Sequence, residues 1–119
     1  MIRSKDTSPE LTVRRLVHGM GYRYLLHVTS LPGKPDLVFP RLKKIIEVRG
    51  CFWHQHPGCI DSHIPKSRTE YWEPKLARNK SRDTANERQL RSQDWILLIL
   101  WECEINTKVT GRLKRFLKE

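Results

Sequence analysis

The sequence contains no apolar run that approaches the roughly 18 residues of a membrane-spanning helix. Its longest apolar run, WILLILW, covers only residues 95–101. The first ten residues, MIRSKDTSPE, lack the apolar segment of a signal peptide. Internal repeats, low-complexity tracts and flexible linkers are absent as well. We therefore expect a single domain over residues 1–119 that lies in the cytoplasm and has no membrane association.

Cysteine is scarce, with three residues in the chain. An odd number of cysteines in a chain expected in the cytoplasm argues against a disulfide framework. It favours a metal site or a reactive thiol.

Acidic residues are also few: 13 Asp and Glu stand against 23 Lys and Arg, which gives a net charge of +10. A small domain with this excess of positive charge most often binds a polyanion, usually nucleic acid. The alternative is a basic surface that only solubilises the protein or resembles that of a ribosomal protein. Disorder is not expected, because 38% of the residues are hydrophobic.

The sequence predicts elements in the order α-β-β-β-α-β-α. The first helix begins at TSPEL, where Thr7 or Ser8 caps it and Glu10 completes a capping box. Val13 and Val17 belong to its apolar face, and Gly19 and Gly21 end it.

Strands are predicted at residues 22–28, and at 36–39 and 43–50 as a hairpin. Residues 66–93 are polar and helical, with a fresh helix start at Pro74. The apolar run 95–101 fits a central strand buried on both faces, and a weak helical pattern follows from Lys108. This order of elements predicts an α/β sandwich.

Two acidic residues of the hairpin are candidates for a catalytic metal site. Asp36 and Glu47 lie at positions where paired antiparallel strands bring two carboxylates together. Mg²⁺ prefers oxygen ligands and keeps several waters, so one or two carboxylates and a backbone carbonyl are sufficient. Arg49 could stabilise charge on a phosphodiester. The pattern is similar to the short PD-(D/E)xK nuclease signature; alternatively, Asp36 caps a turn and Glu47 is a solvated strand residue.

The segment GCFWHQHPGC, residues 50–59, contains a possible zinc site. Cys51, His56 and Cys59 have the spacing C-x4-H-x2-C, and Cys103 could complete a tetrahedron. The alternative is three buried thiols without a metal.

Three further residues of the segment remain for other tasks. His54 would be free to act as an acid or base, or it is a surface histidine without a role. Phe52 and Trp53 are either core residues or aromatic wedges that insert between base pairs.

Taken together, these motifs resemble the very-short-patch repair (Vsr) endonucleases. The resemblance runs from about Ile2 to Cys103. It rests on six motifs in order: IRSKDTSPE, LPGKPDLV, GCFWHQH, SRTEYW, RNKSRD and LLILWEC. It implies a restriction-endonuclease-like fold with a central mixed sheet, flanking helices and a structural zinc. It also implies an enzyme that uses Mg²⁺ to nick one strand of double-stranded DNA at the thymine of a T:G mismatch.

The resemblance also implies a role for each matching residue. Asp36 would bind Mg²⁺ together with the main-chain carbonyl of Val48, and His54 would be the general acid or base. Glu10 would hold a water of the metal shell or orient its helix at the site. The zinc ligands would be Cys51, His56, Cys59 and Cys103, and the aromatic residues entering DNA would be Phe52, Trp53 and Trp72.

The sequence departs from the family pattern at the hairpin. The family usually has an apolar residue at Glu47 and histidine at Arg49, so Glu47 is a possible second Mg²⁺ ligand and Arg49 a possible phosphate contact. Pro57 and Gly58 lengthen the zinc loop by one residue relative to some family members. The N-terminal arm of the family is mostly missing from this sequence.

The leading hypothesis is thus a monomeric T:G mismatch endonuclease associated with the bacterial nucleoid. Basic residues would provide salt-dependent DNA affinity; they include Lys34, Lys43, Lys44, Arg68 and Lys75. A second hypothesis is a restriction, homing or phage-defence nuclease without mismatch preference. A third is a zinc-stabilised DNA-binding module without catalysis.

Overall fold

The structure, a computed structural model, describes residues 7–118, and of Asp61 the backbone alone. Residues 2–6 of the IRSKDTSPE motif lie outside this range. The elements follow the predicted order, with two short 3-10 helices in addition. They are α1 (Ser8–Gly19), β1 (Leu25–Leu26), β2 (Leu37–Phe39), β3 (Lys44–Arg49), η1 (Ile60–Ser62), α2 (Thr69–Ser92), β4 (Ile96–Trp101), η2 (Glu102–Glu104) and α3 (Val109–Lys118).

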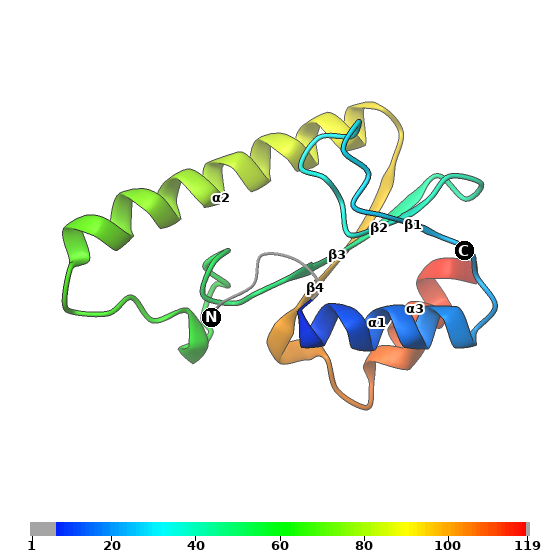
Figure 1. The fold of residues 1–119 in the computed structure, drawn as a ribbon, viewed down its shortest axis with the longest axis horizontal. Helices are drawn as coiled ribbons and strands as arrows, with labels where there is room; N and C mark the ends of the chain where they lie inside the picture. The colour runs from blue at the N-terminus through cyan, green and yellow to red at the C-terminus, as the bar shows by residue number, and fades with distance from the viewer. Residues whose placement is uncertain (1–6, 119) are drawn as a thin grey trace.

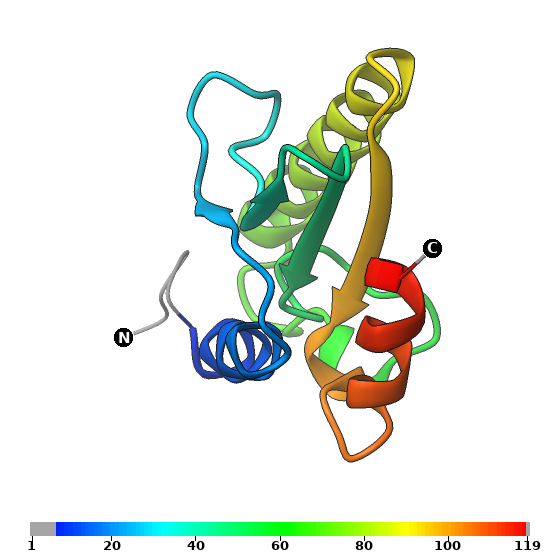
Figure 2. The ribbon, with the colours of Figure 1, turned by 90° about the vertical axis from the view of Figure 1, so that its right-hand side faces the viewer.

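The four strands form one mixed sheet in the order β1-β2-β3-β4. The pairs β1–β2 and β2–β3 are antiparallel, whereas β3 and β4 run parallel and are joined through α2. Helix α2 lies on one side of the sheet, and α1 and α3 lie on the other (Figures 1 and 2). The predicted α/β class, with a mixed sheet between helices, is confirmed.

The side-chain alternation of the strands supplies both faces of the sheet with apolar groups. On the side of α1 and α3, the buried cluster contains Val13, Val17, Leu37, Phe39, Ile46, Leu100, Val109, Leu113 and Leu117. On the side of α2, a smaller cluster joins Val38 and Ile45 to Leu90 near the helix end. The core therefore lies at one end of α2, and the other end extends away from the sheet (Figure 1).

Helix α1 begins as the sequence predicts. The Thr7 hydroxyl accepts a hydrogen bond from the Glu10 N–H at 3.4 Å, and Pro9 occupies the first turn. The Glu10 side chain is only 2% exposed, and its partners are the side chains of Arg14 and His27. Glu10 thus points into the molecule, toward the sheet edge.

The strand predicted over residues 22–28 is much shorter, since only Leu25 and Leu26 pair with β2. Gly21 and His27 adopt positive φ angles, so the chain is not extended before or after Leu25 and Leu26. Both leucines are substantially exposed.

The apolar run 95–101 forms a strand, but the prediction of a central strand is wrong. Among the described residues, β4 lies at the edge of the sheet and pairs only with β3. Leu100 packs on the side of α1 and α3 and Leu97 on the side of α2, so both faces need apolar residues even at the edge. Ile96 is 54% exposed.

The predicted helix start at Pro74 is also wrong. Helix α2 is continuous from Thr69, and Pro74 lies in its second turn, where the missing N–H removes a single helical hydrogen bond. Glu70, whose carbonyl loses this partner, and Pro74 are both exposed, so the carbonyl can bond to water. Only Leu76 and Leu90 are buried in α2, and no helix within residues 7–118 is long and apolar enough to cross a membrane.

Candidate active site and metal-binding cluster

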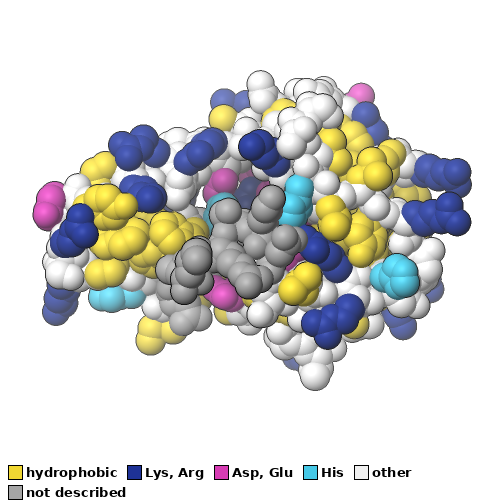
Figure 3. Space-filling model, viewed as in Figure 1, with side chains coloured by type: hydrophobic (Ala, Val, Ile, Leu, Met, Phe, Trp, Pro, Cys, Tyr) yellow, Lys and Arg dark blue, Asp and Glu magenta, His cyan; other side chains and the backbone are white. Residues whose placement is uncertain are grey.

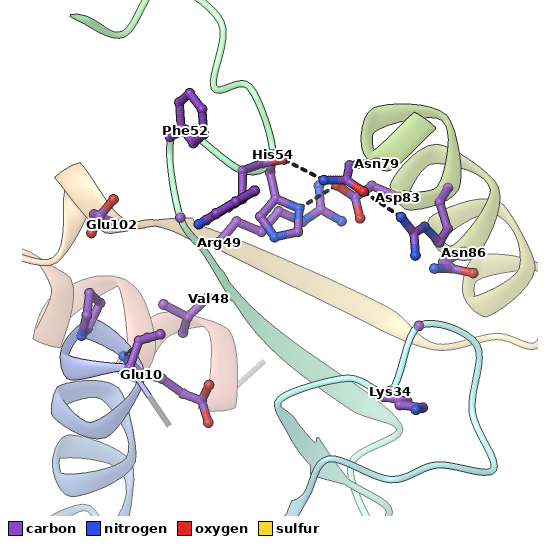
Figure 4. Close-up of a pocket in the computed structure, with 16 residues that line it drawn as sticks. Glu10, Lys34, Val48, Arg49, Phe52, His54, Asn79, Asp83, Asn86 and Glu102 are labelled. Carbon is purple, nitrogen blue, oxygen red and sulfur yellow. Dashed lines mark hydrogen bonds and ion pairs between the residues drawn. The ribbon is translucent and has the colours of Figure 1, made fainter. Parts of the chain in front are cut away.

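A cleft of about 950 Å³ opens between the start of α1, the end of β3 and one face of α2. The side of α2 that lines it has helical spacing, with Asn79, Arg82, Asp83 and Asn86. Figure 4 shows His54 and Asp83 on opposite walls pointing toward each other, with Glu10 and Val48 at the other end. Polar side chains of α1 and α2 therefore share this cleft with Phe52 and Trp53.

Asp36 is fixed at the sheet edge by the register of the hairpin. Leu37 is paired with Ile46, so Asp36 lies opposite the end of β3. Its Oδ2 atom accepts a hydrogen bond from the Val48 N–H at 2.7 Å. This bond holds Asp36 beside Val48, whose main-chain carbonyl is the other Mg²⁺ ligand that the family resemblance implies.

Three side chains that could hold a metal ion meet beside Asp36. The ligand atoms of Glu10, His27 and Asp36 all lie within 4.8 Å of one another. His27 Nε2 is 2.7 Å from a Glu10 carboxylate oxygen and 3.9 Å from Asp36 Oδ1. Arg14 also forms an ion pair with Glu10.

The electrostatics of this group favour a bound cation. Burial raises the pKa of Asp36 to about 7; the Val48 N–H opposes this shift, and the carboxylates of Glu10 and Glu47 add to it. Two buried carboxyl groups are costly to ionise together, and a divalent cation offsets that cost. The donor set of two carboxylates and an imidazole fits such an ion.

Glu47 lies apart from this group, because its carboxylate binds Arg49 at 2.8 Å. Arg49 makes a second ion pair at 2.8 Å with Glu87 from α2, and it is only 8% exposed. Burial raises the pKa of Glu47, although Arg49 opposes the shift. Burial lowers the pKa of Arg49, but the carboxylates of Glu47, Asp83 and Glu87 more than reverse this effect. The two sequence-predicted residues therefore form an ionic network that links β3 to α2.

Replacing Glu87 by glutamine is expected to lower the free energy of unfolding by about 1 kcal/mol, because Arg49 loses one of its two ion-pair partners among the described residues. Chemical denaturation measures the change. Glu73→Gln is the matched control, since Glu73 is an exposed residue on the same helix. An equal loss in both variants would contradict the role of Glu87.

His54 pairs with Asp83 of α2. The His54 Nδ1 atom lies 2.5 Å from Asp83 Oδ2, and its main-chain N–H donates to the Gly50 carbonyl. A carboxylate at Nδ1 favours the tautomer with a proton there, which leaves Nε2 available for proton transfer. This geometry is suitable for a general acid or base facing the cleft.

The Cys/His cluster lies just beyond the ends of β3 and β4. Because these strands are parallel, with Arg49 opposite Trp101, the residues that follow them meet at the same edge. This arrangement brings Cys51 next to Cys103, which are 52 positions apart in sequence. The loop that follows Cys51 turns back on itself, and the His56 N–H donates a hydrogen bond to the Cys51 carbonyl at 2.9 Å.

The ligand atoms of Cys51, His56, Cys59 and Cys103 all lie within 4.8 Å of one another. His56 Nδ1 is 3.7 Å from the sulfur of Cys51 and 3.4 Å from that of Cys103. These spacings match the roughly 3.5 Å between nitrogen and sulfur ligands on a tetrahedral zinc ion. The His56 ring also stacks on Trp101 at 4.2 Å, which fixes its orientation. The four predicted residues could therefore hold a metal together.

Burial raises the pKa of the Cys51 thiol to about 12, and the side chains of Cys103 and Cys59 add to the shift. Thiols that resist ionisation in this way bind a metal only when the ion itself stabilises the thiolates.

The predicted aromatic residues form one group at the end of the cleft. Phe52 lies 5.2 Å from Trp53 and 5.3 Å from Trp72, measured between ring centroids. Tyr71, which the sequence analysis did not select, extends the group at 4.9 Å from Trp72 and is 42% exposed. Figure 3 shows a broad hydrophobic area on this part of the surface with Lys and Arg side chains around it.

Three of the predicted basic residues lie beside the cleft or its aromatic residues, and two do not. Arg68 precedes α2 and lies over the ring of Tyr71 at 4.7 Å, and Lys75 lies over Trp53 at 5.6 Å. Lys34 lines the cleft opposite the α2 face (Figure 4). Lys43 lies over Trp95 at 4.3 Å, whereas Lys44 is buried and donates to the Phe116 carbonyl.

Three residues of the site were missed in the sequence. His27 lies in a segment interpreted as a strand and gives no local signal. Asp83 stands in the RNKSRD motif, so this motif could have pointed to it. Glu87 follows one helical turn later, a spacing that places both acids on the same face of α2.

Comparison with known proteins places this site in a family. The family model for the DNA mismatch endonuclease Vsr matches residues 1–59. The type II nicking enzyme V.XorIIP of Xanthomonas oryzae pv. oryzae is 47% identical over 105 residues, covering 88% of this chain and 76% of that protein. The type II nicking enzyme V.NmeAIP of Neisseria meningitidis serogroup A is 38% identical over 99% of this chain and 85% of its own length.

The DNA mismatch endonuclease Vsr of Escherichia coli K12 is 36% identical over 104 residues, which cover 87% of this chain and 66% of that protein. These relatives are named as endonucleases or nicking enzymes, and a nuclease of this kind acts on DNA with a divalent metal. The chain belongs to the Vsr family and is a DNA endonuclease.

Proposed function

We propose that this protein is a Mg²⁺-dependent endonuclease that nicks one strand of DNA at a T:G mismatch. The main support is one cleft lined by Glu10, by the His54–Asp83 pair and by the half-buried Phe52 and Trp53, with Asp36 next to Glu10. The similarity to a mismatch endonuclease adds to it. The family assignment leaves no support for the third hypothesis, a DNA-binding module without catalysis.

In this proposal Asp36 and the main-chain carbonyl of Val48 would hold Mg²⁺, and Glu10 would hold a water of the metal shell or orient α1 at the site. Bound Mg²⁺ supplies Lewis acidity, which stabilises charge on the phosphate and makes a bound water more acidic. Glu47 remains a possible further ligand, although its carboxylate is engaged with Arg49. Arg49 would balance negative charge on the phosphate through N–H groups that its two carboxylate partners do not use.

His54 would move a proton at its Nε2 atom. Asp83 would hold the ring in the tautomer that this role requires. We expect Asp83→Asn to reduce the nicking rate by about 10- to 100-fold, because an amide can present its NH₂ group to Nδ1 and favour the wrong tautomer.

The rate of Asp83→Asn is measured in single turnover. Asn79→Ala, one turn earlier on the same face of α2, is the control for disturbance of the cleft. A wild-type rate for Asp83→Asn would contradict the proton-transfer role of His54.

Phe52, Trp53 and Trp72 would enter the DNA beside the mismatch. A mismatched step is easier to unstack than a sound one, so aromatic insertion favours it. Lys34 and Arg68 would contact phosphates and make the affinity dependent on salt.

The second hypothesis, a nuclease without mismatch preference, draws on relatives named type II nicking enzymes. The test compares nicking of matched and T:G duplexes of the same sequence in Mg²⁺. The proposal predicts cutting of the T:G duplex with at least tenfold preference. Equal rates on both duplexes would instead support the second hypothesis.

We also propose that the ion at Cys51, His56, Cys59 and Cys103 is zinc with a structural role, since four protein ligands leave no open position. Other expectations remain proposals: a restriction-endonuclease-like fold, one endonuclease domain over residues 1–119, action as a monomer and association with the bacterial nucleoid. A nick in one strand requires a single active site, which agrees with a monomer.

A further inference from the structure

His27 lies in one cluster with Glu10 and Asp36, and the proposed function gives His27 no role. It follows β1 in a left-handed conformation, with φ at 46°, and its N–H donates to the Asp36 carbonyl at 3.2 Å. The backbone thus ties His27 to Asp36 and turns its ring toward Glu10. The His27 side chain is 22% exposed, so it lies at the edge of the cluster with Glu10 and Asp36 rather than in bulk solvent.

The Nε2 atom of His27 has two polar neighbours with conflicting requirements. It lies 2.7 Å from an oxygen of Glu10 and 3.3 Å from Nη2 of Arg14. A guanidinium only donates and an ionised carboxylate only accepts, so one ring nitrogen cannot satisfy both contacts. A proton on Nε2 satisfies the Glu10 contact, whereas a bare Nε2, the form that can bind a metal, satisfies the Arg14 contact.

The spacing of the atoms is that of ligands around one ion. For metal–ligand bonds of about 2.1 Å, neighbouring ligands are about 3 Å apart and opposite ligands about 4.2 Å apart. The Nε2 atom of His27 lies 2.7 Å from Glu10 and 3.9 Å from Asp36, close to these two values. An imidazole also changes the preference of a site, because nitrogen ligands favour transition metals over Mg²⁺.

We propose that His27 is a nitrogen ligand of the catalytic metal, beside Asp36 and Glu10, and that it makes the site prefer Mn²⁺ to Mg²⁺. The inference rests on the proposed function for the existence of a catalytic metal. Arg14 sets a condition, because its guanidinium contacts the same Glu10 oxygen as His27. A cation at this position displaces Arg14 or binds through the other oxygen of Glu10.

Pulsed electron paramagnetic resonance of Mn²⁺ bound to the full chain, loaded first with zinc, tests this inference. A directly bound imidazole gives a ¹⁴N modulation in the Mn²⁺ signal. We expect the modulation in the wild type and its loss in His27→Gln. The Mn²⁺ dissociation constant should rise about tenfold in this variant, with a smaller change for Mg²⁺.

Two further variants control for other imidazoles. His18→Gln removes an exposed imidazole from α1, and His54→Gln removes the imidazole of the cleft. Both should retain the modulation, and circular dichroism confirms that each variant is folded. Bound Mn²⁺ without ¹⁴N modulation in the wild type, or modulation that persists in His27→Gln, would overturn the inference.

The proposed function is judged separately, by nicking of a T:G duplex in Mg²⁺ by the wild type. Nicking without a nitrogen signal would refute the role of His27 and leave the function supported. If the wild type shows the nitrogen signal, His27→Gln loses it, and the wild type does not nick the duplex, the role of His27 as a ligand is supported and the proposed function is refuted.

Discussion

Replacing Asp36 by asparagine is expected to reduce Mg²⁺-dependent nicking by about 10³-fold or more, because the site loses a negatively charged metal ligand. The asparagine can still accept the hydrogen bond from the Val48 N–H, so the hairpin is preserved. Single-turnover cleavage of a labelled duplex measures the loss. Asp94→Asn, an exposed acid at the end of α2, is the control and should cut at the wild-type rate.

The same substitution should stabilise the metal-free protein. The pKa of Asp36 is about 7 in the folded chain and near 3.8 when unfolded, so the folded state binds more protons between these values. Stability therefore falls as the pH rises from about 4 to 7. At pH 8 in EDTA, Asp36→Asn should raise the free energy of unfolding by about 1–3 kcal/mol.

Thermal unfolding in EDTA as a function of pH checks this sign. If Asp36→Asn is less stable than the wild type at pH 8 in EDTA, the electrostatic account of Asp36 is contradicted. Loss of activity together with a gain in stability separates a functional residue from a structural one.

Replacing Cys103 by serine is expected to lower the melting temperature of the zinc-loaded protein by about 10 °C or more, because an ion that stabilises only the folded state is lost. Cys103 is exposed, so its side chain contributes little through packing. The same substitution should have almost no effect after the metal has been removed.

Elemental analysis accompanies this measurement. We expect one equivalent of zinc in the wild type and much less in Cys103→Ser. Ile60→Ser is the control, because Ile60 directly follows the proposed ligand Cys59 and is 88% exposed. Less than about half an equivalent of zinc in folded wild-type protein would contradict the zinc assignment.

Local patterns in the sequence were sufficient to predict most of the fold. The capping residue Thr7, the valines of α1 and the hairpin turn act through neighbours in the chain, so a short window contains their signal. The position of β4 was not predictable in this way. A strand that needs apolar residues on both faces has the same sequence at the centre of a sheet as at its edge.

The residues of the site also divide into those that local sequence patterns identify and those that only tertiary contacts identify. Cys51, His56 and Cys59 stand within nine residues, and as the third cysteine of the chain Cys103 was a candidate fourth ligand before the family resemblance assigned it that role. His27 and Glu87 join the site only through tertiary contacts with Glu10 and Arg49. Neither residue has a distinctive neighbour in the sequence, so only the three-dimensional arrangement reveals it.

The central claim is that a metal ion held at Asp36, next to the cleft residues Glu10 and Val48, supports cutting of one strand of mismatched DNA. A T:G duplex with a different fluorophore on each strand tests it directly, with wild type and Asp36→Ala compared in Mg²⁺. The account predicts that the wild type cuts only the strand containing the mismatched thymine and that Asp36→Ala cuts neither. Cutting by Asp36→Ala at the wild-type rate, or cutting of both strands by the wild type, would contradict it.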